Sequence, residues 1–330
     1  MRAKRVLIIT YYWPPYTGSG VQRWLKFAKY LPEQGWQPVI YTPENPEYSL
    51  VDDSFMEEIP ESCIVIKRPI WEPYKLLQLF KGKSKSANIG LVKSNVSKSF
   101  KDILLNWIRG NIFIPDPRVF WVRPSIRFLA KYLKENPVDL VITTGPPHSM
   151  HLIGLGLKQK LRLKWIADFR DPWSKLDFLD QFLVTGFSRK RYASMESRVL
   201  KNCNAVIGTS NSMKDFLQDF DHQKFYTITN GYDQEDFKDV KEEKPEKFVI
   251  SHTGLLNENR NPVNLWSALE ELCSENPEFY NALEIQLTGL VDPNVVEAIE
   301  SKEYLKEKLV LKGYQAHQEV IRQNARAAVL

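Results

Sequence analysis

The chain alternates short apolar runs with longer segments whose apolar residues recur at helical spacing. Continuous runs of aliphatic and β-branched residues are typical of strands buried in a parallel sheet. Such runs predict strands at 6–9, 38–41, 64–66, 140–142, 165–167, 205–207 and 225–228. The helical patterns between them cover 20–31, 124–134, 149–160, 186–201 and 212–219. This alternation predicts a doubly wound α/β fold.

A polar, charge-dense stretch at 232–247 interrupts the alternation, which then restarts. The second series predicts strands at 248–252, 283–288 and 309–312 and helices at 262–273, 293–300 and 317–324. We therefore expect two Rossmann-like domains with parallel sheets, residues 1–235 and 248–330, joined by a linker at 236–247. Residues 327–330 have the composition of a strand that is just beginning. The pattern thus predicts an incomplete second domain and a truncated chain.

The composition is that of a globular protein, with 43% hydrophobic and 26% charged residues in 330. The net charge of +5 is unevenly placed, because residues 75–109 alone hold eight basic residues and one acid, a net of +7. Apolar residues interleave with these charges, so the segment is expected to contact an anionic membrane surface. The alternative is a solvated insertion with one packed face. No nucleic-acid-binding motif accompanies the charge, so nucleic acid is not expected as a partner.

Three widely separated cysteines make neither a disulfide framework nor a metal signature. The N-terminal apolar run is too short for a signal peptide, and no run approaches the ~20 apolar residues of a membrane span. We therefore expect a cytoplasmic protein with, at most, peripheral contact at the inner face of the cell membrane.

Two loops that follow predicted strands carry the candidate chemistry, and ligands collect at such loops in open α/β sheets. The first contains Gly18, Ser19 and Gly20. Glycines there let backbone N–H groups approach a phosphate or a sugar at a helix N-terminus. The alternative is a plain tight turn. Arg23 stands where a dinucleotide-binding fingerprint has its third glycine, which disfavours a nicotinamide enzyme.

The second loop region carries His148 and His151 at a helix start, and Asp168, Arg170 and Asp171 at a strand end. A histidine there could hydrogen-bond a sugar hydroxyl or deprotonate an acceptor, with His148 the stronger candidate and a merely polar helix-start residue the alternative. Lone charges are costly to bury, so the two carboxylates and the guanidinium are expected to face a ligand or one another. Asp168 and Asp171 are the candidate bases, and a structural ion pair that fixes the loop is the alternative.

In their order and spacing, these segments resemble the retaining glycosyltransferases of family 4. Residues 14–20 resemble the family's glycine loop, and 145–149 followed by 168–173 resemble a bacterial surface-polysaccharide subgroup. Residues 204–210 are similar to its late N-domain strand, and 229–233 to its domain-junction signature. The second domain resembles the family's in three strands followed by glycine, whose matching residues are 252–254, 287–289 and 310–314.

The resemblance implies the GT-B fold and transfer of a sugar from a UDP- or GDP-linked donor to a glycan or lipid-linked acceptor, without a cofactor. It implies a donor site made of Asn230, Gly231, Gly254, Arg260, Thr288, Gly289, Gly313 and Tyr314. It implies an acceptor and phosphate loop made of Gly18, Ser19, Gly20, His151 and Arg170, with His148, Asp168 and Asp171 catalytic. No metal is expected, because helix N-termini and Arg260 would stabilise the departing diphosphate. The D-x-D at Asp219 and Asp221 follows a helix and is interpreted as loop carboxylates.

The chain departs from the family pattern in two places. Leu255 stands where the family usually has an arginine, and Arg260 where it has a lysine. The family's paired glutamates, seven residues apart, would lie beyond residue 330. We therefore expect this chain to be weakly active or inactive. A nucleotide-sugar epimerase of the same fold and an inactive nucleotide-binding fragment are the alternatives.

Overall fold

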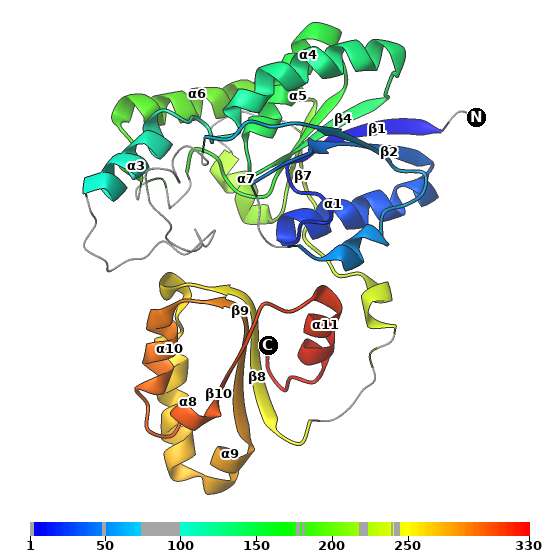
Figure 1. Cartoon of the computed structure of the whole chain (residues 1–330). Coiled ribbons are helices and arrows are strands. Elements are labelled where there is room, and N and C mark those ends of the chain that lie inside the picture. Colours follow the sequence, from blue (N-terminus) through cyan, green and yellow to red (C-terminus); the bar gives the residue numbers. More distant parts are fainter. Residues whose placement is uncertain are drawn as a thin grey trace. The chain divides into compact units, whose positions relative to one another are not determined.

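A computed structural model of the chain describes residues 3–47, 51–73, 100–175, 179, 182–217, 224–238, 240 and 245–330 (Figure 1). The chain divides into two compact units, the first ending at Gly231 and the second running from Tyr232 to Leu330. Both units have parallel sheets, as the sequence pattern predicts. Of the basic segment 75–109, only residues 100–109 are described, and both carboxylates of the D-x-D lie outside the described residues.

The first unit is built on a seven-stranded sheet of order β3-β2-β1-β4-β5-β6-β7. Its strands are β1 (Lys4–Ile9), β2 (Trp36–Pro43), β3 (Ile64–Arg68), β4 (Leu140–Gly145), β5 (Trp165–Phe169), β6 (Ala205–Gly208) and β7 (Phe225–Thr227). Each corresponds to a predicted strand. The strand order reverses between β1 and β4, where Ile9 pairs with Thr143. Ligands of doubly wound folds bind outside the carboxyl ends of strands at such a switch point.

Helices flank this sheet (Figure 1). They are α1 (Ser19–Tyr30), α3 (Phe100–Asn111), α4 (Val119–Glu135), α5 (Ser149–Leu161), α6 (Gly186–Asn202) and α7 (Asn211–Leu217), with 3₁₀ turns η1 (Pro32–Gln34) and η2 (Asp53–Met56). α4 begins five residues before its predicted start, because Pro124 lies inside the helix rather than at its first turn. None of the described helices is long and apolar enough to cross a membrane.

The core of the first unit covers both faces of its sheet. Along β1, Leu7 and Ile9 join one buried cluster, whereas Val6 and Ile8 join another that includes Trp24 of α1. Successive strand residues point to opposite faces, so this alternation requires a packed layer on each side. The continuous apolar run of β1 reflects burial on both faces.

The second unit has a three-stranded parallel sheet of order β10-β9-β8 in the part that the structure describes. Its elements are β8 (Phe248–Leu256), β9 (Leu283–Val291), β10 (Leu309–Gly313), α8 (Val263–Glu275), α9 (Pro277–Ala282), α10 (Pro293–Glu300) and α11 (His317–Ala325), with 3₁₀ turns η5 (Gln234–Phe237), η6 (Glu258–Arg260) and η7 (Lys306–Lys308). Val329 makes a parallel bridge with Ile250, and its carbonyl accepts a 2.9 Å hydrogen bond from the N–H of Ser251. The last residues therefore begin to pair beside β8, as their composition predicts.

Candidate active site

Asp168 lies at the end of β5 with its side chain fully buried. Its Oδ1 accepts a hydrogen bond from Arg23 Nη2 at 3.0 Å, and its Oδ2 accepts bonds from Trp24 Nε1 and Thr144 Oγ1 at 2.8 Å each. The two donors from α1 and the one from β4 compensate the desolvation of this carboxylate, because buried charges are tolerated when they are paired and hydrogen-bonded. Asp168 thereby fixes the first turns of α1 against the ends of β4 and β5.

Arg23 extends this connection to the segment after β7. Its Nη2 also donates to the carbonyl of Ile228 at 2.9 Å. Its Nη1 donates to the carbonyl of Thr229 at 3.2 Å and to Asn230 Oδ1 at 3.1 Å. Asn230, which was predicted to bind the sugar donor, therefore accepts a hydrogen bond from an arginine of α1. Gly231 follows it as an exposed residue. One guanidinium thus holds together three chain segments that are far apart in sequence.

His148 and His151 form a buried aromatic stack beside the Arg23–Asp168 ion pair. The ring of His148 lies 5.1 Å from that of Trp173 with an interplanar angle of 4°, and His151 lies 4.4 Å from Phe169. His151 Nδ1 is 2.8 Å from Thr143 Oγ1, whereas its Nε2 and both ring nitrogens of His148 have no hydrogen-bond partner among the described residues. His148 is 4% exposed and His151 0%. Neither ring faces solvent, where an acceptor would approach.

The same burial sets the charge state of both imidazoles. Burial, with a smaller contribution from the neighbouring Arg170, lowers the pKa of His148 to about 3. Burial also holds the pKa of His151 well below its ordinary value, with His148 and Arg170 contributing. A Cβ on Gly145 would lie 2.6 Å from His151 Nε2, so glycine is needed there to seat the rings. The rings are neutral at physiological pH, and they are suited to positioning the loop rather than to exchanging protons.

Arg170 is the cation of this loop. One Nη donates to the carbonyl of Pro146, and the guanidinium lies 5.7 Å from the ring centroid of Tyr12. A Cβ on Gly20 would lie only 2.5 Å from an Arg170 Nη, so the missing side chain leaves room for this guanidinium. Asp171 follows on the exposed surface and attracts Arg170 electrostatically. Arg170 and Asp171 are thus the charged groups of the strand end that lie nearest the surface.

The loop before α1 needs glycine for a second reason. Gly18 has φ 114°, a conformation that side chains with a Cβ rarely adopt. Its carbonyl accepts the first helical hydrogen bonds, from the N–H of Val21 at 2.9 Å and of Gln22 at 3.2 Å. Ser19 is the first residue of α1. The glycine loop therefore ends the connection from β1 and begins α1.

Two buried carboxylates that the sequence reasoning missed support this region. Glu196 of α6 accepts hydrogen bonds from the N–H of Trp173 at 3.0 Å and of Ser174 at 3.3 Å, and burial raises its pKa. Asp116 accepts from the N–H of Ser149 at 2.8 Å and thereby caps α5 where the histidines begin. Both loops are consequently anchored at their ends.

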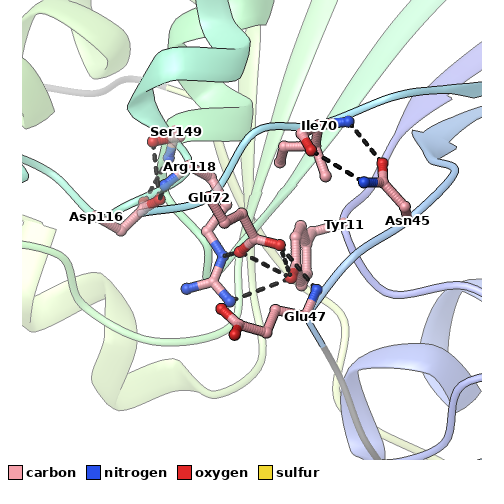
Figure 2. A network of polar contacts seen from close by, with 8 residues as sticks. All are labelled: Tyr11, Asn45, Glu47, Ile70, Glu72, Asp116, Arg118 and Ser149. Carbon is pink, nitrogen blue, oxygen red and sulfur yellow. Dashed lines mark hydrogen bonds and ion pairs between the residues drawn. The ribbon is translucent and has the colours of Figure 1, made fainter. Parts of the chain in front are cut away.

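A second polar network lies after β1 and β3 (Figure 2). Arg118 Nε is 2.8 Å from Glu72 Oε1, and Tyr11 Oη donates to Glu72 at 3.0 Å. Arg118 also lies over the Tyr11 ring, 4.6 Å from its centroid. Burial raises the pKa of Tyr11 far above its ordinary value, so the phenol stays protonated. Arg118 lies two positions after Asp116, so this network fixes the segment that caps α5 and leads into α4.

In the second unit, three neighbouring strands bring the predicted glycines into one row. Gly254 of β8 pairs with Gly289 of β9, and Thr288 pairs with Gly313 of β10. All three glycines have positive φ, at 125°, 113° and 63°. A Cβ on Gly289 would lie 2.3 Å from the Gly254 carbonyl oxygen, whereas a Cβ on Gly254 or Gly313 would meet nothing within 4 Å. Gly289 therefore serves strand packing, and the other two leave open space above the backbone.

The remaining donor candidates of this unit differ in what they contact. Thr288 is buried, and its hydroxyl donates to Gln323 Oε1 of α11 at 3.1 Å. Arg260 is exposed at the end of η6. It lies near enough to His252 to lower the pKa of that histidine, after burial as the main cause. Tyr314 is exposed directly after β10.

The structure thus gathers the predicted residues into two groups, one in each unit. The group in the first unit comprises Gly18, Ser19, Gly20, His148, His151, Asp168, Arg170, Asp171 and Asn230. Arg23 was considered in the sequence only as a departure from the dinucleotide-binding fingerprint, and its role in holding the site together was not predicted. Its signal was available, since an arginine four residues into a helix that follows a glycine loop is poised to reach a strand-end carboxylate.

Comparison with protein families places part of this region in a known class. Residues 94–236 match the family model described as Glycosyltransferase Family 4. The matched range contains the histidine stack, Asp168, Arg170, Asp171 and Asn230. A search of the curated proteins found no match.

Solved structures show the same fold over nearly the whole chain. The structure of TarM has a TM-score of 0.60 at 12% identity, covering 97% of this chain and 78% of its own. Sucrose-phosphate synthase from Thermosynechococcus elongatus has a TM-score of 0.57 at 13% identity, covering 98% and 74%. A protein described as a UDP-N-acetylglucosamine 2-epimerase from Listeria monocytogenes has a TM-score of 0.55 at 9% identity, covering 98% and 72%. The fold is GT-B, with two Rossmann-like units, and the family match supports a glycosyltransferase.

Proposed function

We propose that this protein is a retaining glycosyltransferase that moves a sugar from a UDP- or GDP-linked donor to a glycan or lipid-linked acceptor in cell-surface polysaccharide synthesis. The observation that carries the proposal is the family match over 94–236, which covers the carboxyl-end loops of β4 and β5. These loops hold the polar side chains that a doubly wound fold offers to a ligand. The donor is proposed from the sequence resemblance and, for UDP, from the Listeria protein of similar fold, which is described as a UDP-N-acetylglucosamine 2-epimerase.

The second unit is proposed to bind the donor. The open backbone at Gly254 and Gly313 lets a phosphate or a base approach the main chain closely, because no Cβ lies in the way. Arg260 supplies the charge that a departing nucleoside diphosphate requires. Thr288 acts indirectly, since its hydroxyl is already bonded to Gln323.

The first unit is proposed to bind the acceptor and to supply the reacting groups. Arg170 and Asp171 carry this role, because they reach the surface at the end of β5. Asp171 is the better candidate to accept the acceptor's proton, whereas Asp168 is buried in three hydrogen bonds and holds the site together. His148 and His151 are positioning residues in this proposal, because both rings are buried and neutral.

The test is release of UDP or GDP from a panel of nucleotide sugars, with and without sugar acceptors. Asp171→Asn should lower turnover by about 100-fold or more while nucleotide affinity stays constant, as expected for loss of a general base. Asp215→Asn changes an exposed carboxylate on α7 and is the matched control. Nucleotide affinity is measured beside turnover, so that loss of binding and loss of chemistry are distinguished. Unchanged turnover in Asp171→Asn removes that residue from the mechanism, and failure to bind any nucleotide contradicts the proposal.

The second candidate is a nucleotide-sugar epimerase, supported by the similar fold of the Listeria protein. An epimerase changes the sugar while it remains on the nucleotide and needs no acceptor. Proton NMR of the sugar after incubation without acceptor separates the two activities. Nucleotide binding with neither reaction would instead favour a binding protein.

A further inference from the structure

Helix α3 presents an apolar stripe to solvent. Phe100, Ile103, Leu104 and Trp107 recur at the spacing of one helix face, and they are between 39% and 78% exposed. A helix of a globular protein ordinarily turns such a stripe toward the core. In α3 the side turned toward the protein is a different one, since Leu105 and Ile108, which lie three residues apart on another side of the helix, are half-buried. The exposed stripe is therefore an additional apolar surface.

The apolar surface continues onto the start of α6. The Asn111 side chain donates to the carbonyl of Leu183 at 3.2 Å and accepts from the N–H of Thr185 at 2.9 Å. These bonds attach the end of α3 to the residues that open α6, and Figure 1 shows both helices on the same side of the first unit. Leu183 is 51% exposed and Phe187 is 78% exposed. Contiguous exposed apolar residues of this kind mark an interaction site.

Positive charge borders this surface. Arg189, Lys190 and Arg191 are exposed in the first turns of α6, and no acidic residue occurs between 183 and 195. The sequence that leads into α3 is also basic, with a net charge of +7 over 75–109. We propose that the α3–α6 face, defined as the exposed stripe of α3 with Leu183, Phe187 and the three basic residues, docks on an anionic lipid bilayer.

The composition of the α3–α6 face fits a bilayer surface better than another protein. Tryptophan and phenylalanine favour the membrane interface, and lysine and arginine beside them meet anionic headgroups. Each basic residue near an anionic leaflet strengthens binding by about fivefold. The inference extends the proposed function, because a lipid-linked acceptor lies in that bilayer. It is tested without turnover, so it can fail or succeed independently of the proposed chemistry.

The first experiment is flotation of the whole chain with vesicles of phosphatidylcholine, with and without phosphatidylglycerol. Binding is expected only with the anionic lipid and is expected to weaken with salt. Phe100→Ser and Trp107→Ser should each weaken binding by about tenfold or more, because each removes a large apolar side chain from the interface. Leu272→Ser removes an exposed apolar residue of α8 in the second unit and should leave binding unchanged.

The second experiment removes charge. The double variant Lys190→Gln with Arg191→Gln should weaken binding to anionic vesicles by roughly thirtyfold, as two basic residues predict. The matched control is Lys131→Gln with Lys134→Gln, which removes two basic residues from the exposed side of α4. Circular dichroism of all variants checks that they remain folded.

Three results would overturn the proposal. One is absence of binding to anionic vesicles, and another is equal weakening in the control variants. The third is self-association of the chain, seen by light scattering and abolished by Phe187→Ser, without vesicle binding; this would assign the α3–α6 face to a second copy.

Discussion

The buried pair between Arg23 and Asp168 makes the sharpest prediction about how the first unit is held together. Arg23 Nη2 lies 3.0 Å from Asp168 Oδ1, and the two side chains are 3% and 0% exposed. Arg23→Met removes the counterion but keeps most of the apolar stem. The carboxylate of Asp168 then keeps Trp24 and Thr144 as its hydrogen-bond donors in the described part of the chain.

The expected loss follows from the burial of both groups. Removing one partner of a buried ion pair costs about 3–5 kcal/mol, because the other charge is left uncompensated. That is a large part of the roughly 5–15 kcal/mol that stabilises a typical domain. For a unit of this size, about 2–4 °C of melting temperature per kcal/mol gives a fall of roughly 6–20 °C.

Urea unfolding followed by circular dichroism measures this loss in a double-mutant cycle. Asp168→Leu is the second single variant, and the double variant removes both charges together. The double variant should be more stable than the sum of the single losses predicts, by about 2 kcal/mol or more, because no lone charge remains. Arg322→Met breaks an exposed pair with Glu319 and should cost less than about 1 kcal/mol. A loss below about 1 kcal/mol in Arg23→Met, or simple additivity in the cycle, would refute the reasoning.

Three further predictions concern the histidine stack and the second unit. His148→Phe keeps an aromatic ring in the stack but cannot take up a proton. The wild-type free energy of unfolding should fall relative to that of the variant as the pH drops from about 6.5 toward 3, by at most about 1.4 kcal/mol per pH unit, because the folded pKa of His148 is near 3 while the unfolded chain binds the proton. Urea unfolding of both proteins across this pH range tests the prediction. Gly289→Ala should destabilise the second unit by about 2 kcal/mol or more in thermal unfolding, because of its positive φ and blocked Cβ, whereas Gly231→Ala, with open space, should change little. Arg260→Ala should weaken UDP or GDP binding by roughly tenfold to a hundredfold in calorimetry, as loss of a charge-assisted hydrogen bond predicts, whereas Arg322→Ala should not.

The arrangement of strands and helices could be predicted because each buried strand is a continuous apolar run and each helix has a periodic face. Val6 to Ile9 illustrates this, since every residue of the run is buried in one layer or the other. The strands of the second unit could be predicted equally well, because each is an apolar run followed by a glycine. Positive φ at Gly254, Gly289 and Gly313 explains the glycines, although β8 and β9 continue two residues past theirs and only β10 ends at its glycine.

The internal connections of the site could not be predicted, because they join residues far apart in sequence. Arg23 and Asp168 are 145 residues apart, and only the fold brings them to 3.0 Å. His148 stands at a helix start, where sequence suggests exposure, yet the Trp173 ring covers it. Glu196 lies within α6 and offers no local sign that it anchors the loop after β5, more than twenty positions earlier.

The measurement that tests the central claim most directly follows a labelled sugar. The chain is incubated with UDP- and GDP-sugars labelled in the sugar, together with a lipid extract and soluble glycans, and the products are separated and identified by mass spectrometry. The account predicts label on a lipid or glycan, with UDP or GDP released in equal amount and the anomeric configuration of the donor kept. Label that stays on the nucleotide as a different sugar, or that appears only as free sugar, would contradict it.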